Sequence, residues 1–233
     1  IHSYLIYRLT GEIAIDYSAA GNLGGVYDFD NRRWSGEMAG LLGLDLAQLP
    51  GNLKASTDIA GGVNAEFAKK LGLPQGTPVL CGTVDCLAAM LSIGCVNEGD
   101  NAAILGTSLN WGYLSAKRPT DPNLVSMPYC LDPERLTYVY GGASTAGALP
   151  RWFMTNFVGS ETQADYQRME DAATPVPAGA EGLILLPYFM GERTPIWDES
   201  ASGVFMGLSL NHTRGHMYRA ILESSAYALR DIV

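Results

Sequence analysis

The chain has little positive charge and no cluster of it. Its 233 residues contain 15 lysines and arginines against 24 acidic residues, and basic residues adjoin only in pairs such as Arg32-Arg33 and Lys69-Lys70. Proteins that bind nucleic acid usually carry a basic patch on one face. Nucleic acid is therefore not an expected partner, and an anionic ligand would have to be held by backbone amides and a divalent cation.

Long apolar runs and paired cysteines are missing as well. No apolar run reaches the roughly 18 residues that a membrane span needs, so neither a membrane span nor a signal peptide is expected. The four cysteines show no Cys-x-x-Cys spacing. Reduced thiols in a cytoplasmic protein are expected from this pattern.

The length and the two ends of the chain limit what it represents. A 47% hydrophobic content is ample for a packed core, and 233 residues suit one large domain or two small ones. The chain opens at Ile1 without an initiator Met and stops at Val233 within a helical pattern. We expect it to be a piece of a longer protein.

Apolar periodicity predicts two regions that differ in their pattern of helices and strands. Helices are expected near 34–43, 63–71, 87–91, 147–158 and 161–172 and from 213 onward, after a short helical run near the start. Strands are expected at 77–82, 102–105, 109–114, 124–130, 136–140 and 183–186. This order indicates an α/β layered fold. Beyond Gly99-Asp100 the predicted elements are mainly strands, and this change predicts a domain boundary near residue 98.

Asp85 stands where a predicted buried strand passes into a predicted helix, in Gly82-Thr83-Val84-Asp85. An enzyme that phosphorylates an alcohol needs a carboxylate to accept the hydroxyl proton, and little other covalent help. A helix N-terminus favours the ionised form of such a carboxylate. The alternative is that Asp85 is simply an N-cap, a position that Asp commonly occupies.

Two glycine-containing turns are candidate anion sites. Gly106-Thr107-Ser108 connects two strands and could present a nest of backbone amides to phosphate, although turn chemistry alone also explains it. The run 141–147 leaves a strand and opens a helix, which would offer free amides to an anion, or it is a close-packing turn. Neither run matches a Rossmann or P-loop pattern.

The last fifth of the chain contains three further elements. Glu192 and Arg193 lie in a polar loop, where they could pair with each other or brace neighbouring backbone, and we favour the brace. His212 and His216 stand four apart without a third ligand, so no metal site is predicted there. The final helix shows small and apolar residues at helical spacing, which ordinary packing explains.

Together these motifs resemble the FGGY family of carbohydrate kinases, and most closely its xylulokinase-like members. The resemblance rests on Asp16-Tyr17-Ser18, on Asp85 followed about twenty residues later by Leu105-Gly106-Thr107-Ser108, and on three C-terminal motifs. These are Gly191-Glu192-Arg193-Thr194-Pro195, Gly203-Val204-Phe205-Met206-Gly207-Leu208 and the run from His216 to Glu223.

The resemblance implies a fold, cofactors and partners. It implies two actin-like, ribonuclease-H-like domains, each partly present: residues 1–98 from the first, sugar-binding domain and 99–233 from the second, nucleotide-binding domain. The cofactors would be ATP and Mg²⁺, and the substrate a small sugar or polyol, with a ketopentose such as xylulose favoured. A homodimer is kept as a candidate assembly. Motifs of the family would lie on both sides of this stretch, so we expect the piece alone to be inactive.

The resemblance also assigns roles to residues. Asp85 would be the catalytic base and a substrate contact, and Cys86 would lie beside the substrate. Gly106, Thr107, Ser108, Gly147 and Arg151 would contact the nucleotide phosphates. Cys86 stands where the family usually has Asn or Gln, which puts one sugar contact in doubt. Ser202, Ser224 and Ser225 depart from the usual Arg and Gly, with consequences for packing.

Two other classes of function remain as alternatives. One is a non-catalytic actin-like binding or regulatory module, which would lack ATP binding. The other is a glycoside hydrolase that uses Asp85 and Glu192 as a carboxylate pair, which requires the two carboxyls within about 5 to 10 Å of each other.

Overall fold

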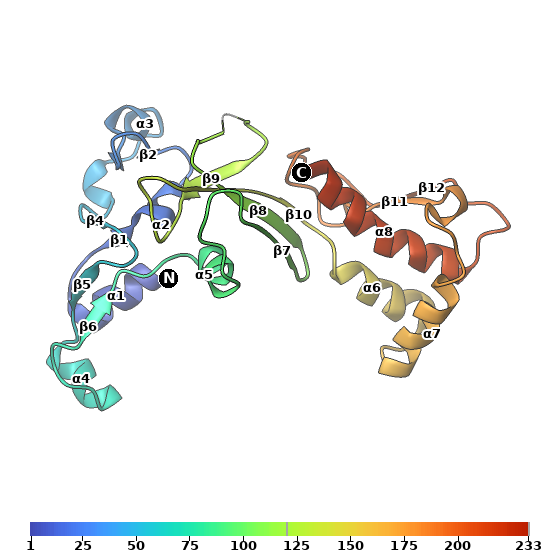
Figure 1. Cartoon of the computed structure of the whole chain (residues 1–233), viewed down its shortest axis with the longest axis horizontal. Coiled ribbons are helices and arrows are strands. Elements are labelled where there is room, and N and C mark those ends of the chain that lie inside the picture. The colour runs from blue at the N-terminus through green and yellow to red at the C-terminus, as the bar shows by residue number, and fades with distance from the viewer. Residues whose placement is uncertain (120, 233) are drawn as a thin grey trace. The chain divides into compact units, whose positions relative to one another are not determined.

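The computed structural model describes residues 1–119 and 121–232, which form two compact units (Figure 1). The first unit comprises Ile1–Asn101, Tyr113–Thr120 and Ser126–Val139, and the second comprises Ala102–Gly112, Asp121–Val125 and Tyr140–Val233. The predicted boundary near residue 98 remains a prediction. The predicted end of the second domain at Val233 lies outside the described residues.

The first unit is built from short elements. In chain order they are α1 (His2–Thr10), β1 (Ile15–Asp16), α2 (Tyr17–Gly21), β2 (Tyr27–Asp28), β3 (Arg33–Trp34), α3 (Gly36–Leu41), a 3₁₀ turn (Leu46–Gln48), β4 (Leu53–Lys54), β5 (Ile59–Gly62), α4 (Ala65–Leu71), β6 (Pro78–Leu80) and α5 (Asp85–Ser92). β1 pairs with β4 in parallel, whereas β2 pairs with β3 and β5 with β6 in antiparallel fashion.

A small apolar cluster fixes the end of β6. Cys81, directly after this strand, is fully buried against Ile6, Ala14 and Ala60. Leu87 is also fully buried and anchors the next element, α5. Apolar contacts therefore hold both the strand and the helix that flank the segment 82–84.

A four-stranded sheet follows in the chain, with the order β7-β8-β10-β9. Its strands are β7 (Asn101–Leu105), β8 (Leu109–Ser115), β9 (Val125–Pro128) and β10 (Thr137–Ala143). The Tyr129 hydroxyl, just past β9, donates to the carbonyl of Cys95 at 2.5 Å. This buried hydrogen bond ties the end of β9 to the segment that follows α5.

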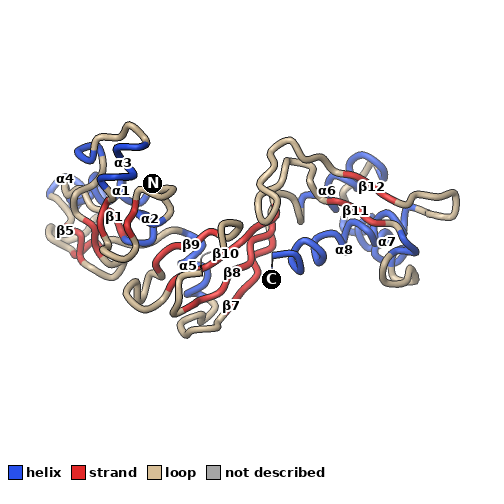
Figure 2. Tube along the Cα trace, turned by 90° about the horizontal axis from the view of Figure 1, so that it is seen from above, coloured by secondary structure: helices blue, strands red, loops and turns tan. Residues whose placement is uncertain are grey.

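The second unit continues with α6 (Ala148–Phe153) and a π-helical turn (Met154–Val158), then α7 (Gln163–Ala173), a 3₁₀ turn (Ala180–Gly182), β11 (Ile184–Leu186), β12 (Val204–Met206) and α8 (Arg214–Ile232). β11 and β12 are antiparallel, with Leu185 opposite Phe205. α7 and α8 lie side by side (Figures 1 and 2). Leu149, Phe153, Leu183, Leu185 and Ile221 belong to the core that these elements enclose.

Local sequence signals explain many of the element ends. Asn64 caps α4 by accepting from the Phe67 amide at 3.0 Å, and Gly72 ends this helix in the left-handed conformation. Thr162 caps α7 in the same way as Asn64. The helices expected near 34–43, 63–71, 87–91, 147–158, 161–172 and from 213 are confirmed, with ends shifted by a few residues.

The strands of the first unit were largely missed. β1 to β4 have two residues each, which is too short for an alternating pattern to be recognised. β12 was also missed, because its pairing with β11 is a tertiary contact between segments about twenty residues apart. The strands expected at 77–82, 102–105, 109–114, 124–130, 136–140 and 183–186 are confirmed as β6 to β11.

We predict that Gly215→Ala destabilises the second unit. A Cβ at position 215 would lie 2.3 Å from the carbonyl oxygen of Ala172, so α7 and α8 would have to separate. Overpacking of this kind costs about 1–3 kcal/mol, measurable as a lower urea midpoint. The control is Gly40→Ala in α3, where a Cβ meets nothing within 4 Å; it should be neutral or slightly stabilising. Equal midpoints for the two variants would contradict this packing.

Candidate functional site

Asp85 is the first residue of α5, at the predicted junction between a strand and a helix. Its side chain is exposed, and Oδ1 accepts from the Cys86 amide at 2.7 Å. The N-cap position belongs to Val84, which makes no side-chain cap bond. The interpretation of Asp85 as an N-cap is therefore wrong, since the helix begins one residue earlier than that interpretation requires.

Backbone hydrogen bonds and one side chain hold the segment before Asp85. The amide of Cys81 donates to Asp58 at 2.8 Å and the amide of Gly82 donates to Ser56 at 2.9 Å. Gly82 has φ 74°, a conformation that favours glycine. The Thr83 hydroxyl lies 2.8 Å from the Ser18 hydroxyl. Backbone hydrogen bonds and the Thr83 side chain together fix the direction in which the chain enters α5.

Cys86 follows Asp85 and is partly buried. Burial is the main cause that raises the pKa of the Cys86 thiol to about 11, and the charge of the neighbouring Asp85 carboxylate raises it further. The thiol is therefore neutral near pH 7. A neutral thiol is a weak hydrogen-bonding group, so this side chain offers a substrate mainly shape and apolar surface.

The structure brings the two candidate phosphate turns together within the second unit. The Gly147 amide donates to the Gly106 carbonyl at 3.0 Å, and the amides of Ala146 and Ala148 donate to the Thr107 carbonyl at 2.9 and 3.3 Å. The turn between β7 and β8 therefore lies directly against the start of α6. Sequence reasoning placed both turns near an anion but did not predict this contact between them.

These hydrogen bonds correct one expectation. One of the two interpretations of the run 141–147 expected free amides for an anion, but turn carbonyls accept the amides of Ala146 and Gly147 and also that of Ala148. The sequence could not show this, because the acceptors come from a turn about forty residues earlier. Among the described hydrogen bonds, none has the amide of Thr107 or Ser108 as its donor. These two amides are candidate donors to phosphate oxygens.

Gly147 has no room for a side chain. A Cβ at this position would lie 2.3 Å from the carbonyl oxygen of Gly106. The close-packing interpretation of this run is thereby confirmed. Whether Gly147 also contacts a nucleotide remains a prediction.

Arg151 projects from α6 and is largely exposed. Its Nε donates to Glu161 Oε2 at 3.0 Å. The Thr155 hydroxyl donates to the same carboxylate. This hydrogen bond, and after it the charge of Arg151, lower the pKa of Glu161 against the opposing effect of desolvation. Arg151 is therefore held at the end of α6 by a pair that is open to solvent.

Glu192 braces the glycine-rich run, as the sequence analysis favoured. Its side chain is 5% exposed, and Oε1 accepts from the Ser144 amide at 2.8 Å and from the Arg193 amide at 2.7 Å. The other oxygen, Oε2, is buried without a hydrogen-bond partner among the described residues. One carboxylate oxygen thus fixes the segment that leads to Gly147.

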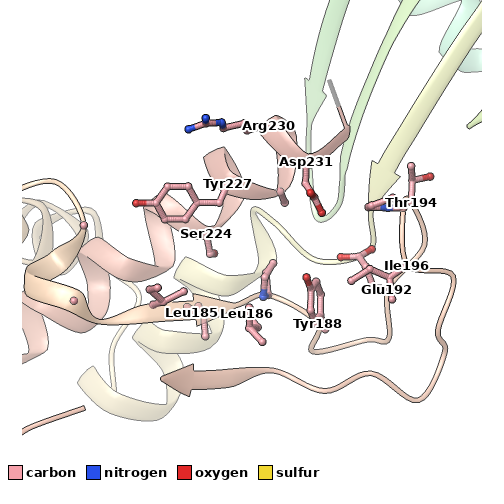
Figure 3. Close-up of a pocket in the computed structure, with 16 residues that line it drawn as sticks. Leu185, Leu186, Tyr188, Glu192, Thr194, Ile196, Ser224, Tyr227, Arg230 and Asp231 are labelled. Carbon is pink, nitrogen blue, oxygen red and sulfur yellow. The ribbon is translucent and has the colours of Figure 1, made fainter. Parts of the chain in front are cut away.

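Sequence reasoning missed a cavity of about 540 Å³ in the second unit (Figure 3). It lies between β11 and the C-terminal half of α8, and its lining includes Tyr188, Glu192, Ser224 and Asp231. Burial raises the pKa of Tyr188, and the carboxylates of Asp231 and Glu192 raise it further. The signal that the sequence offers is the row of small residues on the final helix, since Ser224 and Ala228 of this row line the cavity.

The two histidines use their ring nitrogens locally. His212 Nδ1 accepts from the Ser209 amide at 2.9 Å and His216 Nδ1 accepts from the Thr213 amide at 3.2 Å.

Of the helices in residues 1–119 and 121–232, none combines the length and apolar character required to cross a lipid bilayer.

Comparison with known proteins identifies the family. The model of the FGGY family of carbohydrate kinases matches residues 1–92 with its N-terminal domain and residues 101–233 with its C-terminal domain. The chain belongs to this family. Its domains have the actin-like, ribonuclease-H-like fold, which confirms the predicted fold class.

Several named relatives align with almost the whole chain. Xylulose kinase of Lactococcus lactis subsp. lactis is 33% identical over 231 residues, which are 98% of this chain and 44% of that protein. Gluconokinase of Bacillus licheniformis is 30% identical over 236 residues, covering 98% and 45%. The chain thus spans about half the length of the curated relatives it matches.

Solved structures agree with these matches. Ligand-bound xylulose kinase from Lactobacillus acidophilus superposes with a TM-score of 0.89 at 28% identity, covering 99% of this chain and 46% of that chain. Gluconate kinase from the same organism superposes with a TM-score of 0.90 at 29% identity, with the same coverage.

We predict that Glu192→Ala loosens the glycine-rich run and Glu192→Gln does not. The alanine leaves the Ser144 and Arg193 amides without an acceptor, at about 1–3 kcal/mol for an unsatisfied buried group. The glutamine keeps one carbonyl oxygen for both amides. Amide hydrogen exchange checks this, with faster exchange at residues 144 and 193 expected only in the alanine variant. Faster exchange in both variants would show that the negative charge, rather than the acceptor atom, matters.

Proposed function

We propose that the protein containing this chain phosphorylates a hydroxyl of a small sugar or polyol with ATP, and that Asp85 is its catalytic base. The observation that carries this proposal is the exposed carboxylate on the first residue of α5, in a chain of the FGGY carbohydrate kinase family. A kinase acting on an alcohol requires one such acceptor and little further covalent chemistry.

In this proposal the Asp85 carboxylate takes the hydroxyl proton as the acceptor oxygen attacks phosphorus. Cys86 lies next to it in the first unit and contributes a neutral, partly buried surface to the sugar site. The shape of this surface would exclude water from the acceptor hydroxyl. Exclusion matters because water at the same place would be phosphorylated instead, with net hydrolysis of the donor.

The turn 106–108 suits the phosphates. The Thr107 and Ser108 amides and hydroxyls offer donors, and Gly147 permits an approach that any side chain would block. Arg151 adds a positive charge at the end of α6. ATP would supply the phosphoryl group, and Mg²⁺ would offset the charge on its oxygens in a chain with formal net charge −9.

The substrate is proposed to be a ketopentose such as xylulose. The support is the 33% identity to a xylulose kinase, against 30% to gluconokinase and 28% to a glycerol kinase from Solidesulfovibrio magneticus. The four free cysteines suit a reducing compartment, and we place the protein in the cytoplasm.

The two alternatives gain less support. A regulatory module would have no need of an exposed carboxylate on the first residue of α5. For a hydrolase, Glu192 would have to act as acid or nucleophile, yet its Oε1 already accepts two backbone amides. The named relatives are kinases, so they add nothing to the hydrolase alternative.

We predict that Asp85→Asn lowers kcat by about 10²–10⁴-fold in the full gene product, because the amide cannot take the proton. The KM for ATP should be unchanged, since Asp85 does not contact the phosphates in this proposal. Asp45→Asn is the control, because Asp45 only caps a 3₁₀ turn in the same unit. Sugar-dependent ADP release shows the rate, and an Asp85→Asn enzyme with normal kcat would end the proposal.

The choice of substrate has its own test. Xylulose, gluconate and glycerol should be compared by kcat/KM with ATP in the full gene product. We expect xylulose to give the highest value. A higher value for gluconate or glycerol would replace xylulose while leaving the kinase proposal intact. The absence of ATP binding by calorimetry, together with no turnover on any sugar or polyol, would favour the regulatory module.

A further inference from the structure

A carboxylate that the proposed reaction does not use lies behind the Asp85 segment. Asp16 ends β1 and caps α2, and its side chain is 0% exposed. Its Oδ1 lies 2.8 Å from His2 Nε2. Its Oδ2 accepts from the amides of Ser18 and Ala19 at 3.1 and 3.2 Å and from the Ser56 hydroxyl at 3.3 Å. The Ser18 hydroxyl also donates to Oδ2.

Two of these partners hold the residues that precede α5. The Ser18 hydroxyl lies 2.8 Å from the Thr83 hydroxyl, and the Ser56 carbonyl accepts the Gly82 amide at 2.9 Å. Burial raises the pKa of the Cys130 thiol, and the nearby Thr83 side chain partly offsets this rise. A continuous chain of polar contacts therefore runs from buried Asp16 through Ser18 to Thr83, two residues before Asp85.

The Asp85 side chain has little support of its own. It is exposed, and the described hydrogen bonds give it only the amide of the next residue, Cys86. Its direction is therefore set by the backbone at 82–85. Misplacement of a reacting group by about 1 Å can cost on the order of 100-fold in rate. A segment that turns through glycine at φ 74° needs a fixed contact to keep one direction.

We propose that Asp16, Ser18 and Thr83 are positioning residues that fix the direction of Asp85. Asp16 orients the Ser18 hydroxyl, and Ser18 holds Thr83. This inference rests on the proposed function, because it assumes that Asp85 is the base. It adds that the rate depends on a hydroxyl pair that touches neither substrate nor nucleotide.

Helix capping explains only part of this arrangement. A capping Asp needs to accept amides from its own helix, as Asp45 does from Ala47 at 2.9 Å. Asp16 does this for α2 as well, but capping does not require the contact between Ser18 and Thr83. Ser18→Ala removes the hydroxyl and keeps the Ser18 amide, so the cap of α2 survives in this variant.

The test uses Ser18→Ala, Thr83→Val and Thr83→Ser in the full gene product. We expect the first two to lower kcat by about 10–100-fold with unchanged KM for ATP. Thr83→Ser retains the hydroxyl and should keep kcat within about twofold of the unaltered enzyme. Ser35→Ala is the matched control, since Ser35 only caps α3 by accepting from Met38 at 3.2 Å. Amide exchange at residues 82–86 should be faster in Ser18→Ala and Thr83→Val alone.

A double variant separates positioning from loss of stability. Groups that act as a unit are strongly non-additive in rate. Ser18→Ala should therefore cause no further loss of kcat in an Asp85→Asn background, where there is no base to position. Multiplying losses, or an unchanged kcat in both Ser18→Ala and Thr83→Val, would overturn the inference while the Asp85→Asn result still supports the kinase. Normal kcat in Asp85→Asn would overturn both proposals.

Discussion

Burying a carboxylate is costly unless several donors satisfy it. Each unit of this protein does so beside a segment to which the proposed chemistry is assigned. In the first unit Asp16, 0% exposed, gathers two amides and two hydroxyls behind the segment 82–85. In the second unit Glu192, 5% exposed, accepts two amides and braces the run that ends at Gly147. Acceptors that lie deep in the fold thus fix turns whose own residues are small or exposed.

The two carboxylates differ in how many of their oxygens have hydrogen-bond partners, and this difference bears on their roles. Both oxygens of Asp16 have partners, so its network has a single satisfied arrangement. Glu192 uses Oε1 twice, while Oε2 is buried without a partner among the described residues. A fully satisfied buried network rigidifies its surroundings, whereas a partly satisfied one is free to gain a donor. Asp16 is therefore the better candidate for a residue that holds its neighbours rigidly. Glu192 has an oxygen that can still accept a hydrogen bond, so its hydrogen bonding can change.

The sequence was informative wherever local chemistry decides the outcome. The junction at Asp85, the turn at Gly106 and the helix opening after Gly147 each carry their signal within a few residues, and all three are confirmed as structure. Contacts between segments that are distant in the sequence could not be predicted from it. The Gly106 carbonyl meets the Gly147 amide, and Ser18 meets Thr83 across 65 positions. For the same reason the sequence left open whether the amides of the run 141–147 are free, although carbonyls of the earlier turn accept those of Ala146 and Gly147.

The pair between Arg151 and Glu161 bears on the phosphate assignment. Its two charged atoms, Arg151 Nε and Glu161 Oε2, lie 3.0 Å apart. Both side chains are open to solvent, however, and exposed pairs contribute little because water screens them and two long side chains must be ordered. A bond to a phosphate is charge-assisted and forms with a more highly charged partner than a single carboxylate. In the proposed function, exchange of Glu161 for phosphate would therefore be favourable, and the pair does not argue against a phosphate contact by Arg151.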